Sequence, residues 1–189
     1  MGTMLQSAGL KRGESPETLN ITNKQLIIDI HRQYADAGCD IIKTNTFGAN
    51  RVKLTGYPVK EIVAAAINNA REAAGNKLVA LDVGPTGKLM EPYGELSFDE
   101  ACEVFSEVMR EGEKNGADIV LIETMSDTYE LKAAVVAAKE STSLPVYATV
   151  TFDESGRLLT GADVPTVVTL LEGLGVDALG FNCGIGPKQ

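Results

Sequence analysis

Five short apolar stretches of this sequence each end in a polar or reactive side chain. The five residues are Asn45, Asp82, Glu123, Thr151 and Cys183. A carboxylate can hold the ammonium group of a ligand through charge-assisted hydrogen bonds. A thiol can act as a nucleophile or as a ligand for a soft metal ion. If these side chains gather at one place, the sequence predicts a ligand site there.

Alternating helices and buried strands must bring these residues together. The helical spacing of apolar residues predicts helices over 22–37, 59–74, 98–114, 128–140 and 165–173. The strands are expected at 41–46, 78–83, 119–122, 146–151 and 178–182. Because each crossover contains a helix, which returns the chain to the same end, the five strands should be parallel. Their carboxyl ends should then share one edge of the sheet, where such sheets bind ligands.

Three residues have plain structural alternatives to a functional role. Glu123 ends a buried strand, where a structural salt bridge would satisfy its carboxylate as well as a ligand's ammonium group would. Cys183 could equally be a small core residue. His31 is the only histidine and lies mid-helix, so we expect it at the surface or boundary rather than in a Ser-His-Asp site.

Composition and charge argue against several classes of protein. The chain has 189 residues, of which 44% are apolar and 23% charged, as in an ordinary globular domain. A formal net charge of −9 argues against a nucleic-acid partner, which would require a basic face. No apolar run approaches the roughly 20 residues of a membrane helix, and the start has no signal-peptide pattern. Three widely spaced cysteines make no disulfide framework, so we expect a cytoplasmic protein without a membrane partner.

Two α/β architectures fit this pattern of elements. A (β/α)₈ barrel usually needs about 250 residues, so five βα units in 189 residues would be a barrel that lacks pieces at both ends. An open doubly wound sheet of five strands is the alternative, and length alone favours it. A Gly-x-Asp motif precedes three strands, at Gly38–Asp40, Gly116–Asp118 and Gly175–Asp177. It indicates either repeating βα units or a common loop between helix and strand.

Several motifs, taken together, resemble the homocysteine S-methyltransferase family. They are Thr44–Ala49 (TNTFGA), Asp82–Gly87 (DVGPTG), Ile122–Asp127 (IETMSD), Thr151–Arg157 (TFDESGR) with Leu159–Gly161 (LTG), and Gly180–Gly184 (GFNCG). The resemblance runs in order over essentially the whole chain. The GPTG and LTG pieces are most similar to the homocysteine-binding domain of the cobalamin-dependent methionine synthase branch.

The resemblance implies a (β/α)₈ TIM barrel and so decides against the open sheet. Residues 1–189 would form a partial homocysteine-binding domain, with the first strand of the barrel and its last units absent. The family also implies a zinc ion held by three cysteines, of which Cys183 is one and two lie outside this chain. One ligand cannot hold zinc tightly. The fragment alone is therefore expected to be inactive, poorly stable and prone to self-association through its open sheet edges.

By the same resemblance, the substrate is homocysteine and the product is methionine. Zinc would activate the homocysteine thiol as a zinc thiolate, which attacks a methyl group carried on cobalamin and charged from methyltetrahydrofolate. Folate- and cobalamin-binding domains of a longer protein would be the partners. Glu123 would hold the substrate amino group and Phe47 would line the pocket. Asn45 and Asn182 would shape it.

Other functions stay open at this point. The methyl donor could be S-methylmethionine or betaine, a non-metal α/β enzyme could use Cys183 as its nucleophile, or the chain could be a non-catalytic fragment. Alkylation of Cys183 without any dependence on zinc would identify the non-metal enzyme. Failure to bind a small thiol would identify the non-catalytic fragment.

Overall fold

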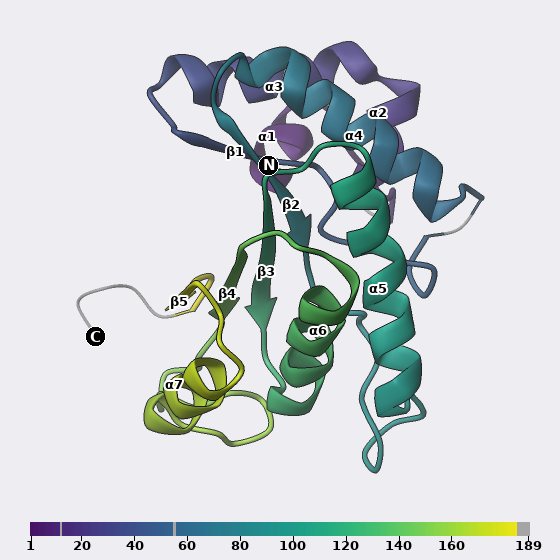
Figure 1. The fold of residues 1–189 in the computed structure, drawn as a ribbon. Helices are drawn as coiled ribbons and strands as arrows, with labels where there is room; N and C mark the ends of the chain where they lie inside the picture. The colour runs from purple at the N-terminus through teal and green to yellow at the C-terminus, as the bar shows by residue number, and fades with distance from the viewer. Residues whose placement is uncertain (12, 55, 185–189) are drawn as a thin grey trace.

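Five parallel strands form one sheet in the computed structural model, which describes residues 1–11, 13–54 and 56–184 (Figure 1). The strands are β1 (Ile41–Lys43), β2 (Leu78–Val83), β3 (Ile119–Met125), β4 (Val146–Val150) and β5 (Ala178–Phe181). Their spatial order β1-β2-β3-β4-β5 follows the sequence, and each neighbouring pair is parallel. The prediction of five parallel strands is therefore confirmed. A doubly wound sheet requires a reversal of strand order, which the described strands do not show.

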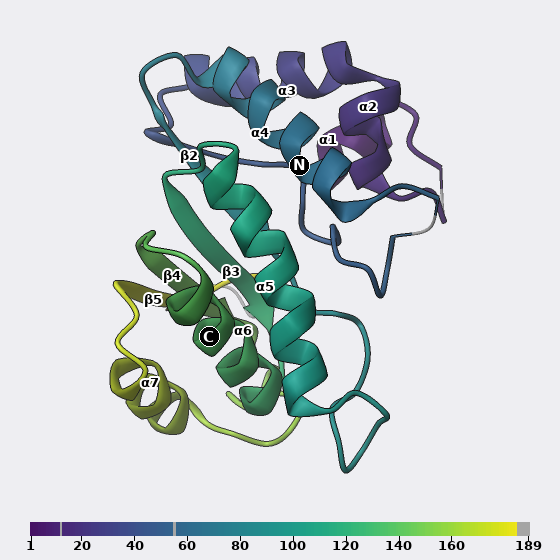
Figure 2. The same ribbon diagram turned by 45° about the vertical axis from the view of Figure 1, so that its right-hand side comes forward.

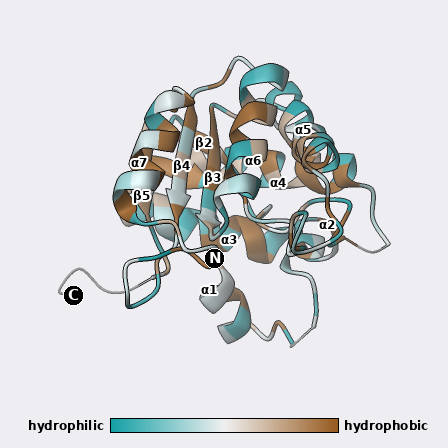
Figure 3. Cartoon of the chain, turned by 90° about the horizontal axis from the view of Figure 1, so that it is seen from below, coloured by the Kyte–Doolittle hydropathy of each residue, from teal (hydrophilic) through white to brown (hydrophobic). Residues whose placement is uncertain are grey.

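Helices separate the strands and lie along the outside of the sheet. The helical elements are α1 (Gly2–Ser7), the 3-10 turn η1 (Pro16–Thr18), α2 (Leu19–Thr22), α3 (Lys24–Asp36), α4 (Val59–Ala74), α5 (Phe98–Lys114), α6 (Thr128–Ser141) and α7 (Val164–Gly173). Helices α3 to α6 pack side by side in chain order (Figures 1 and 2). Figure 3 shows hydrophobic segments where these helices face the strands. Within the described residues, no helix is long and apolar enough to cross a membrane.

The first helices differ from the prediction. The helix expected over 22–37 begins at Lys24, because Asn23, with φ −145° and ψ 58°, separates it from α2. The short elements α1, η1 and α2 have no counterpart in the prediction, since residues 1–21 carry no continuous apolar periodicity. His31 is 1% exposed, so its prediction as a surface or boundary residue is wrong. Burial lowers the pKa of His31 to about 4, which keeps the ring neutral within α3.

Strand β1 ends earlier than expected, at Lys43 rather than at residue 46. Beyond Lys43, the amide of Thr44 still donates to Ala80 O at 2.9 Å, and two hydroxyl groups add further hydrogen bonds to β2. The hydroxyl of Thr44 accepts a hydrogen bond from Asp82 N at 3.1 Å, and the hydroxyl of Thr46 donates one to Asp82 O at 2.7 Å. Both threonines are buried. The segment after β1 is therefore fixed against the carboxyl end of β2, where Asp82 lies.

The repeated Gly-x-Asp motif joins neighbouring strands at their amino ends. Asp118 accepts a hydrogen bond from Val79 N at 2.7 Å, and Asp177 accepts one from Val146 N at 2.8 Å. In each case a side chain that precedes one strand satisfies an early amide of its neighbour. The glycines of the motif have positive φ values, which other residues rarely adopt. The polar residues at the amino edge of the sheet therefore have a structural role. A ligand site is expected at the carboxyl edge.

Helix α5 packs closely on β2 at Gly112, and a substitution there tests this packing. A Cβ atom at Gly112 would lie 2.4 Å from Leu81 Cδ2, and Leu81 is fully buried. We expect Gly112→Val to lower the free energy of unfolding by about 1–3 kcal/mol, because extra carbon atoms in a packed core force neighbouring side chains out of their rotamers. Urea unfolding of the full-length protein would measure this change.

Gly173→Ala is the matched control, because nothing lies within 4 Å of a Cβ atom at this position in α7. Alanine favours helix over glycine, so this variant should keep the stability of the unchanged protein or gain about 0.5–1 kcal/mol. Equal losses in the two variants would contradict the packing assigned to Gly112.

Candidate functional site

A row of polar side chains crosses the carboxyl edge of the sheet. Its members, in spatial order, are Asp82, Lys43, Glu123, Asn182 and Cys183. Lys43 Nζ lies 3.6 Å from Asp82 Oδ2 and 2.5 Å from Glu123 Oε1. On the other side of the glutamate, Asn182 Nδ2 lies 3.5 Å from Glu123 Oε2 and 3.6 Å from Cys183 Sγ. We call these five residues the polar row.

Glu123 and Lys43 form the central ion pair of the polar row. The side chain of Glu123 is 13% exposed and that of Lys43 is 39% exposed. Burial opposes the charge of Lys43, but the nearby Asp82 and Glu123 outweigh it and raise the Lys43 pKa. The lysine is therefore charged at neutral pH. The salt bridge considered as an alternative role for Glu123 is present, and it uses only one of the two carboxylate oxygens.

Asp82 is the buried end of the polar row. Its side chain is 4% exposed, and Oδ1 has no hydrogen-bond partner among the described residues. Burial raises the pKa of Asp82 well above its usual value, and the carboxylate of Glu123 raises it further, while Lys43 opposes the shift. Two carboxyl groups share one lysine here, so the buried one keeps its proton to a higher pH.

Asn182 connects three strand ends through its side-chain amide. Its Oδ1 accepts hydrogen bonds from Thr124 N and Thr149 Oγ1, each at 3.1 Å. Its Nδ2 donates to Thr124 Oγ1 at 2.9 Å. Thr124 lies at a register shift of β3 and has a φ of 62°, a left-handed conformation that is strained for a threonine. Asn182 therefore holds a strained irregularity of β3 next to Glu123.

Cys183 follows β5, and its side chain is exposed among the described residues, which favours a reactive or metal-binding thiol over a core cysteine. Its φ of 54° is again left-handed. The Sγ atom lies 3.6 Å from Asn182 Nδ2 and 3.9 Å from Thr124 Oγ1. An exposed thiol is accessible to a metal ion or an electrophile.

The loop after β1 holds two other predicted site residues, and the contacts described for them are with residues outside the polar row. Asn45 is 4% exposed, and its Nδ2 donates to Pro16 O at 2.7 Å. The ring of Phe47 packs on Gly84, where a Cβ atom would lie 2.5 Å from Phe47 Cε2. Phe47 also lines a hollow of about 450 Å³ together with Lys53, whose Nζ lies 5.4 Å from the ring centroid. The contacts of Asn45 thus join it to the amino-terminal segment.

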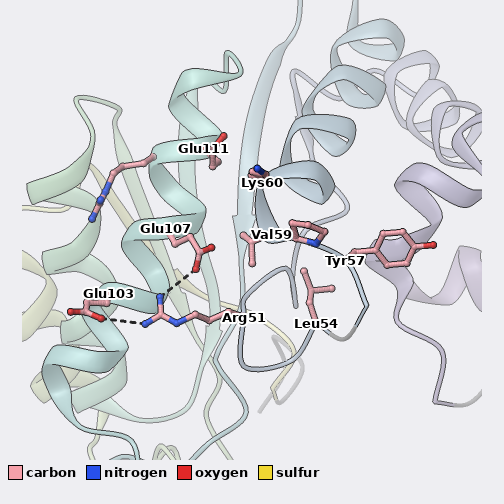
Figure 4. A pocket seen from close by; sticks show the side chains of 10 residues that line it. Arg51, Leu54, Tyr57, Val59, Lys60, Glu103, Glu107 and Glu111 are labelled. Atoms are coloured by element: carbon pink, nitrogen blue, oxygen red, sulfur yellow. Dashed lines mark hydrogen bonds and ion pairs between the residues drawn. The ribbon is translucent and has the colours of Figure 1, made fainter.

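A larger hollow, of about 770 Å³, lies away from the polar row, beside α4 and α5 (Figure 4). Arg51 bridges two glutamates of α5 there, with one guanidinium nitrogen 3.3 Å from Glu103 and another 3.3 Å from Glu107. The charges of these three residues pair with one another on the outside of the helices. The residues that line this hollow include no member of the polar row, so its size does not mark the site.

The exposed thiol of Cys183 fits a soft metal ion such as zinc, which takes cysteine sulfur as a ligand. Among residues 1–11, 13–54 and 56–184, no group of three His, Cys, Asp or Glu residues is arranged to hold a metal ion. The described part of this edge therefore offers one soft ligand.

Comparison with known proteins decides the family. The chain matches the homocysteine S-methyltransferase family over residues 1–189. It belongs to that family. Over its whole length it is 31% identical to the methionine synthase of Mycobacterium tuberculosis and 30% identical to that of Mycobacterium leprae. It spans only 18% and 17% of the length of these two relatives. The resemblance seen in the motifs is confirmed.

Solved structures of homocysteine methyltransferases have the same fold. The metallated form of MmuM from Escherichia coli matches with a TM-score of 0.84 at 24% identity, over 100% of this chain and 73% of that chain. The oxidized form gives 0.83 at 25% identity, over 97% and 71%. The carboxyl transferase domain of Rhizobium etli pyruvate carboxylase gives 0.55 at 18% identity, over 83% and 23%. The predicted fold class, part of a TIM barrel, is confirmed.

Two residues of this family member's site lie outside the sequence prediction. Lys43 ends β1. A charged residue at the end of a buried strand requires a partner, so the sequence did indicate that Lys43 would pair with an acidic group. Thr124 gave no signal, because threonine is not a residue that favours a positive φ. The sequence therefore identified the carboxylate and the thiol, but not the lysine between the carboxyl groups.

The raised pKa of Asp82 predicts a pH-dependent effect of Asp82→Asn on stability. The folded protein keeps the Asp82 proton at pH values where the unfolded chain, with its ordinary pKa of 3.8, has lost it. Asp82 therefore lowers the free energy of unfolding progressively as pH rises from 3.8 through its folded pKa. Asparagine does not titrate, so the stability of the variant relative to the unchanged protein should rise over that range in urea unfolding.

Asp177→Asn should show the opposite sign. The hydrogen bond from Val146 N lowers the pKa of Asp177. The stabilising effect of this carboxylate is thus present above its ordinary pKa of 3.8 and is lost as pH falls through the folded pKa. This variant should be destabilised at neutral pH and little affected in acid. A stability difference for Asp82→Asn that is constant with pH would contradict the account of its burial.

Proposed function

We propose that this chain carries the homocysteine-binding site of a methyltransferase that forms methionine. The observation on which the proposal depends is the polar row, because it offers partners for both ends of a thiol amino acid: charged groups at Lys43 and Glu123, and a thiol at Cys183. Membership of the homocysteine S-methyltransferase family and the identity to two proteins named methionine synthase support the same reaction.

Glu123 would bind the substrate ammonium group with its partly buried carboxylate. Asn182 would fix the direction of that carboxylate, because its amide lies near Oε2 and also holds the backbone of Thr124. A carboxylate held in this way loses little freedom when the ligand arrives. Phe47 would line the pocket and Asn45 would shape it, as the family resemblance implies.

Cys183 would be one of three cysteine ligands of a zinc ion, with the other two outside the described residues. Bound zinc would supply a Lewis acid that keeps the substrate sulfur deprotonated at neutral pH, where a free thiol is mostly protonated. A metallated structure of MmuM supports a metal ion in this fold. This chain would contribute an exposed Sγ whose position is set by the neighbouring Asn182 amide.

The methyl donor in this proposal is methylcobalamin, charged from methyltetrahydrofolate by other domains of a longer cytoplasmic protein. The DVGPTG and LTG motifs support that branch of the family. The matched relatives also extend far beyond the region that this chain covers, which leaves room for folate- and cobalamin-binding domains. S-methylmethionine or betaine as donor would require neither domain.

Cys183→Ser should remove zinc and methyl transfer together in the full-length protein. A hydroxyl group is a much poorer zinc ligand than a thiolate, so the metal would not be retained. Zinc content and methionine formation would be measured on the same preparation. Cys102→Ser is the control, because Cys102 is half-buried on α5 with its Sγ 3.6 Å from Ala133 O, and it should keep both properties.

Two outcomes would contradict this role of Cys183. Zinc at unchanged stoichiometry with full activity would show that Cys183 is neither a ligand nor a reacting group. Unchanged zinc with activity lost would favour Cys183 as a metal-independent nucleophile.

Glu123→Gln should weaken homocysteine binding while leaving zinc in place. A charge-assisted hydrogen bond to an ammonium group contributes about 1.5–3 kcal/mol, which corresponds to a roughly ten- to hundredfold loss of affinity. Titration calorimetry on the full-length protein would measure the loss. Glu172→Gln is the control. It removes an exposed carboxylate on α7, outside the polar row, and should leave homocysteine affinity unchanged. Unchanged affinity in Glu123→Gln would show that the glutamate serves only as the partner of Lys43.

A further inference from the structure

We propose that Lys43 is a second substrate-binding residue, which holds the carboxylate of the amino acid whose ammonium group binds Glu123. The inference rests on the proposed function and adds a determinant of specificity to it. Glu123 and Lys43 together would then recognise a zwitterion, that is, an α-amino acid rather than a simple thiol or a simple amine.

The position of Lys43 supports this role. Its Nζ lies 2.5 Å from Glu123 Oε1 and 3.6 Å from Asp82 Oδ2. An ammonium group has three donors, and these two carboxyl oxygens use at most two of them. The lysine side chain is 39% exposed, whereas those of Glu123 and Asp82 are 13% and 4% exposed. Lys43 is thus the accessible member of this group, with a donor left for a ligand.

The two carboxylate oxygens of Glu123 face opposite ends of the polar row. Oε1 faces Lys43, and Oε2 faces Asn182, whose amide lies 3.6 Å from Cys183 Sγ. An amino acid with its sulfur near Cys183 and its ammonium group on Glu123 would extend past the glutamate toward Lys43. Its carboxylate would therefore meet the lysine and not another carboxylate.

Charge balance also favours a zwitterion. Asp82 is buried, and Oδ1 has no hydrogen-bond partner among the described residues. A buried carboxyl that keeps its proton competes weakly for the lysine, so Lys43 and Glu123 balance each other as one positive and one negative charge. A zwitterion adds no net charge to this partly buried pair, whereas an amine or a carboxylic acid alone would leave one charge without a partner.

Homocysteine and two analogues separate the roles of Lys43 and Glu123. 4-Mercaptobutyrate lacks the amino group of homocysteine, and 3-aminopropanethiol lacks its carboxylate. Binding of all three would be measured by calorimetry on the full-length protein and on its Lys43→Gln variant. We expect Lys43→Gln to bind homocysteine and 4-mercaptobutyrate roughly tenfold or more weakly, as for the loss of a charge-assisted hydrogen bond. Its affinity for 3-aminopropanethiol should not fall.

Two further variants guard against a trivial loss of folding. Lys43→Arg keeps the charge and should retain most of the preference for ligands that carry a carboxylate. Lys114→Gln removes an exposed lysine whose ion pair among the described residues is with Glu111 on its own helix, and this variant should bind all three thiols normally. Thermal unfolding of each variant would show that the fold is intact.

The outcomes distinguish the inference from the function on which it rests. If Lys43→Gln weakens the binding of all three ligands equally, Lys43 only orients Glu123 and the inference is overturned. The inference is also overturned if this variant binds homocysteine and 4-mercaptobutyrate as tightly as the unchanged protein does. If Lys43→Arg loses the carboxylate preference as completely as Lys43→Gln, charge is not the basis and the inference also fails. If the unchanged protein binds none of the three thiols, the proposed function itself fails.

Discussion

The ion pair between Lys43 and Glu123 sets the chemistry of the carboxyl edge. The side chain of Glu123 is 13% exposed and that of Lys43 is 39% exposed, so each group has the other as its partner in a partly buried position. Their pairing leaves Asp82 as the surplus carboxyl, and its burial favours the protonated form. It also leaves Glu123 Oε2 facing the amide of Asn182, which lies 3.6 Å from Cys183 Sγ. This short contact joins the carboxyl ends of β1 and β3 at the edge that a ligand would approach.

The two edges of the sheet use their polar residues in opposite ways. At the amino edge, Asp118 and Asp177 each accept a hydrogen bond from a backbone amide of the neighbouring strand and also pair with a basic side chain, Arg71 and Lys139 respectively. At the carboxyl edge, Thr124 and Cys183 have strained positive φ values, and Asp82 has an oxygen without a partner among the described residues. Strain and unused hydrogen-bonding capacity are characteristic of binding sites, where a ligand completes the arrangement.

The order of helices and strands could be predicted from the sequence because apolar periodicity and helix-ending glycines are local signals. Chemistry-bearing residues at strand ends could be predicted for the same reason, and Glu123 and Cys183 do lie in one row. Asn45 and Thr151 also follow strands, but Asn45 bonds to Pro16 and the amide of Thr151 bonds to Met125 O. Which of several side chains at an edge meet depends on strand register and on local irregularities such as the register shift at Thr124. These are properties of long-range packing that no short stretch of sequence encodes.

The central claim is that one amino acid spans the polar row, and a crystal structure of the full-length protein with zinc and homocysteine tests it most directly. The account predicts the ligand ammonium group within hydrogen-bond distance of Glu123, the ligand carboxylate at Lys43, and the ligand sulfur on the same metal ion as Cys183 Sγ. Homocysteine bound elsewhere in the barrel, or a zinc ion that Cys183 does not touch, would contradict it.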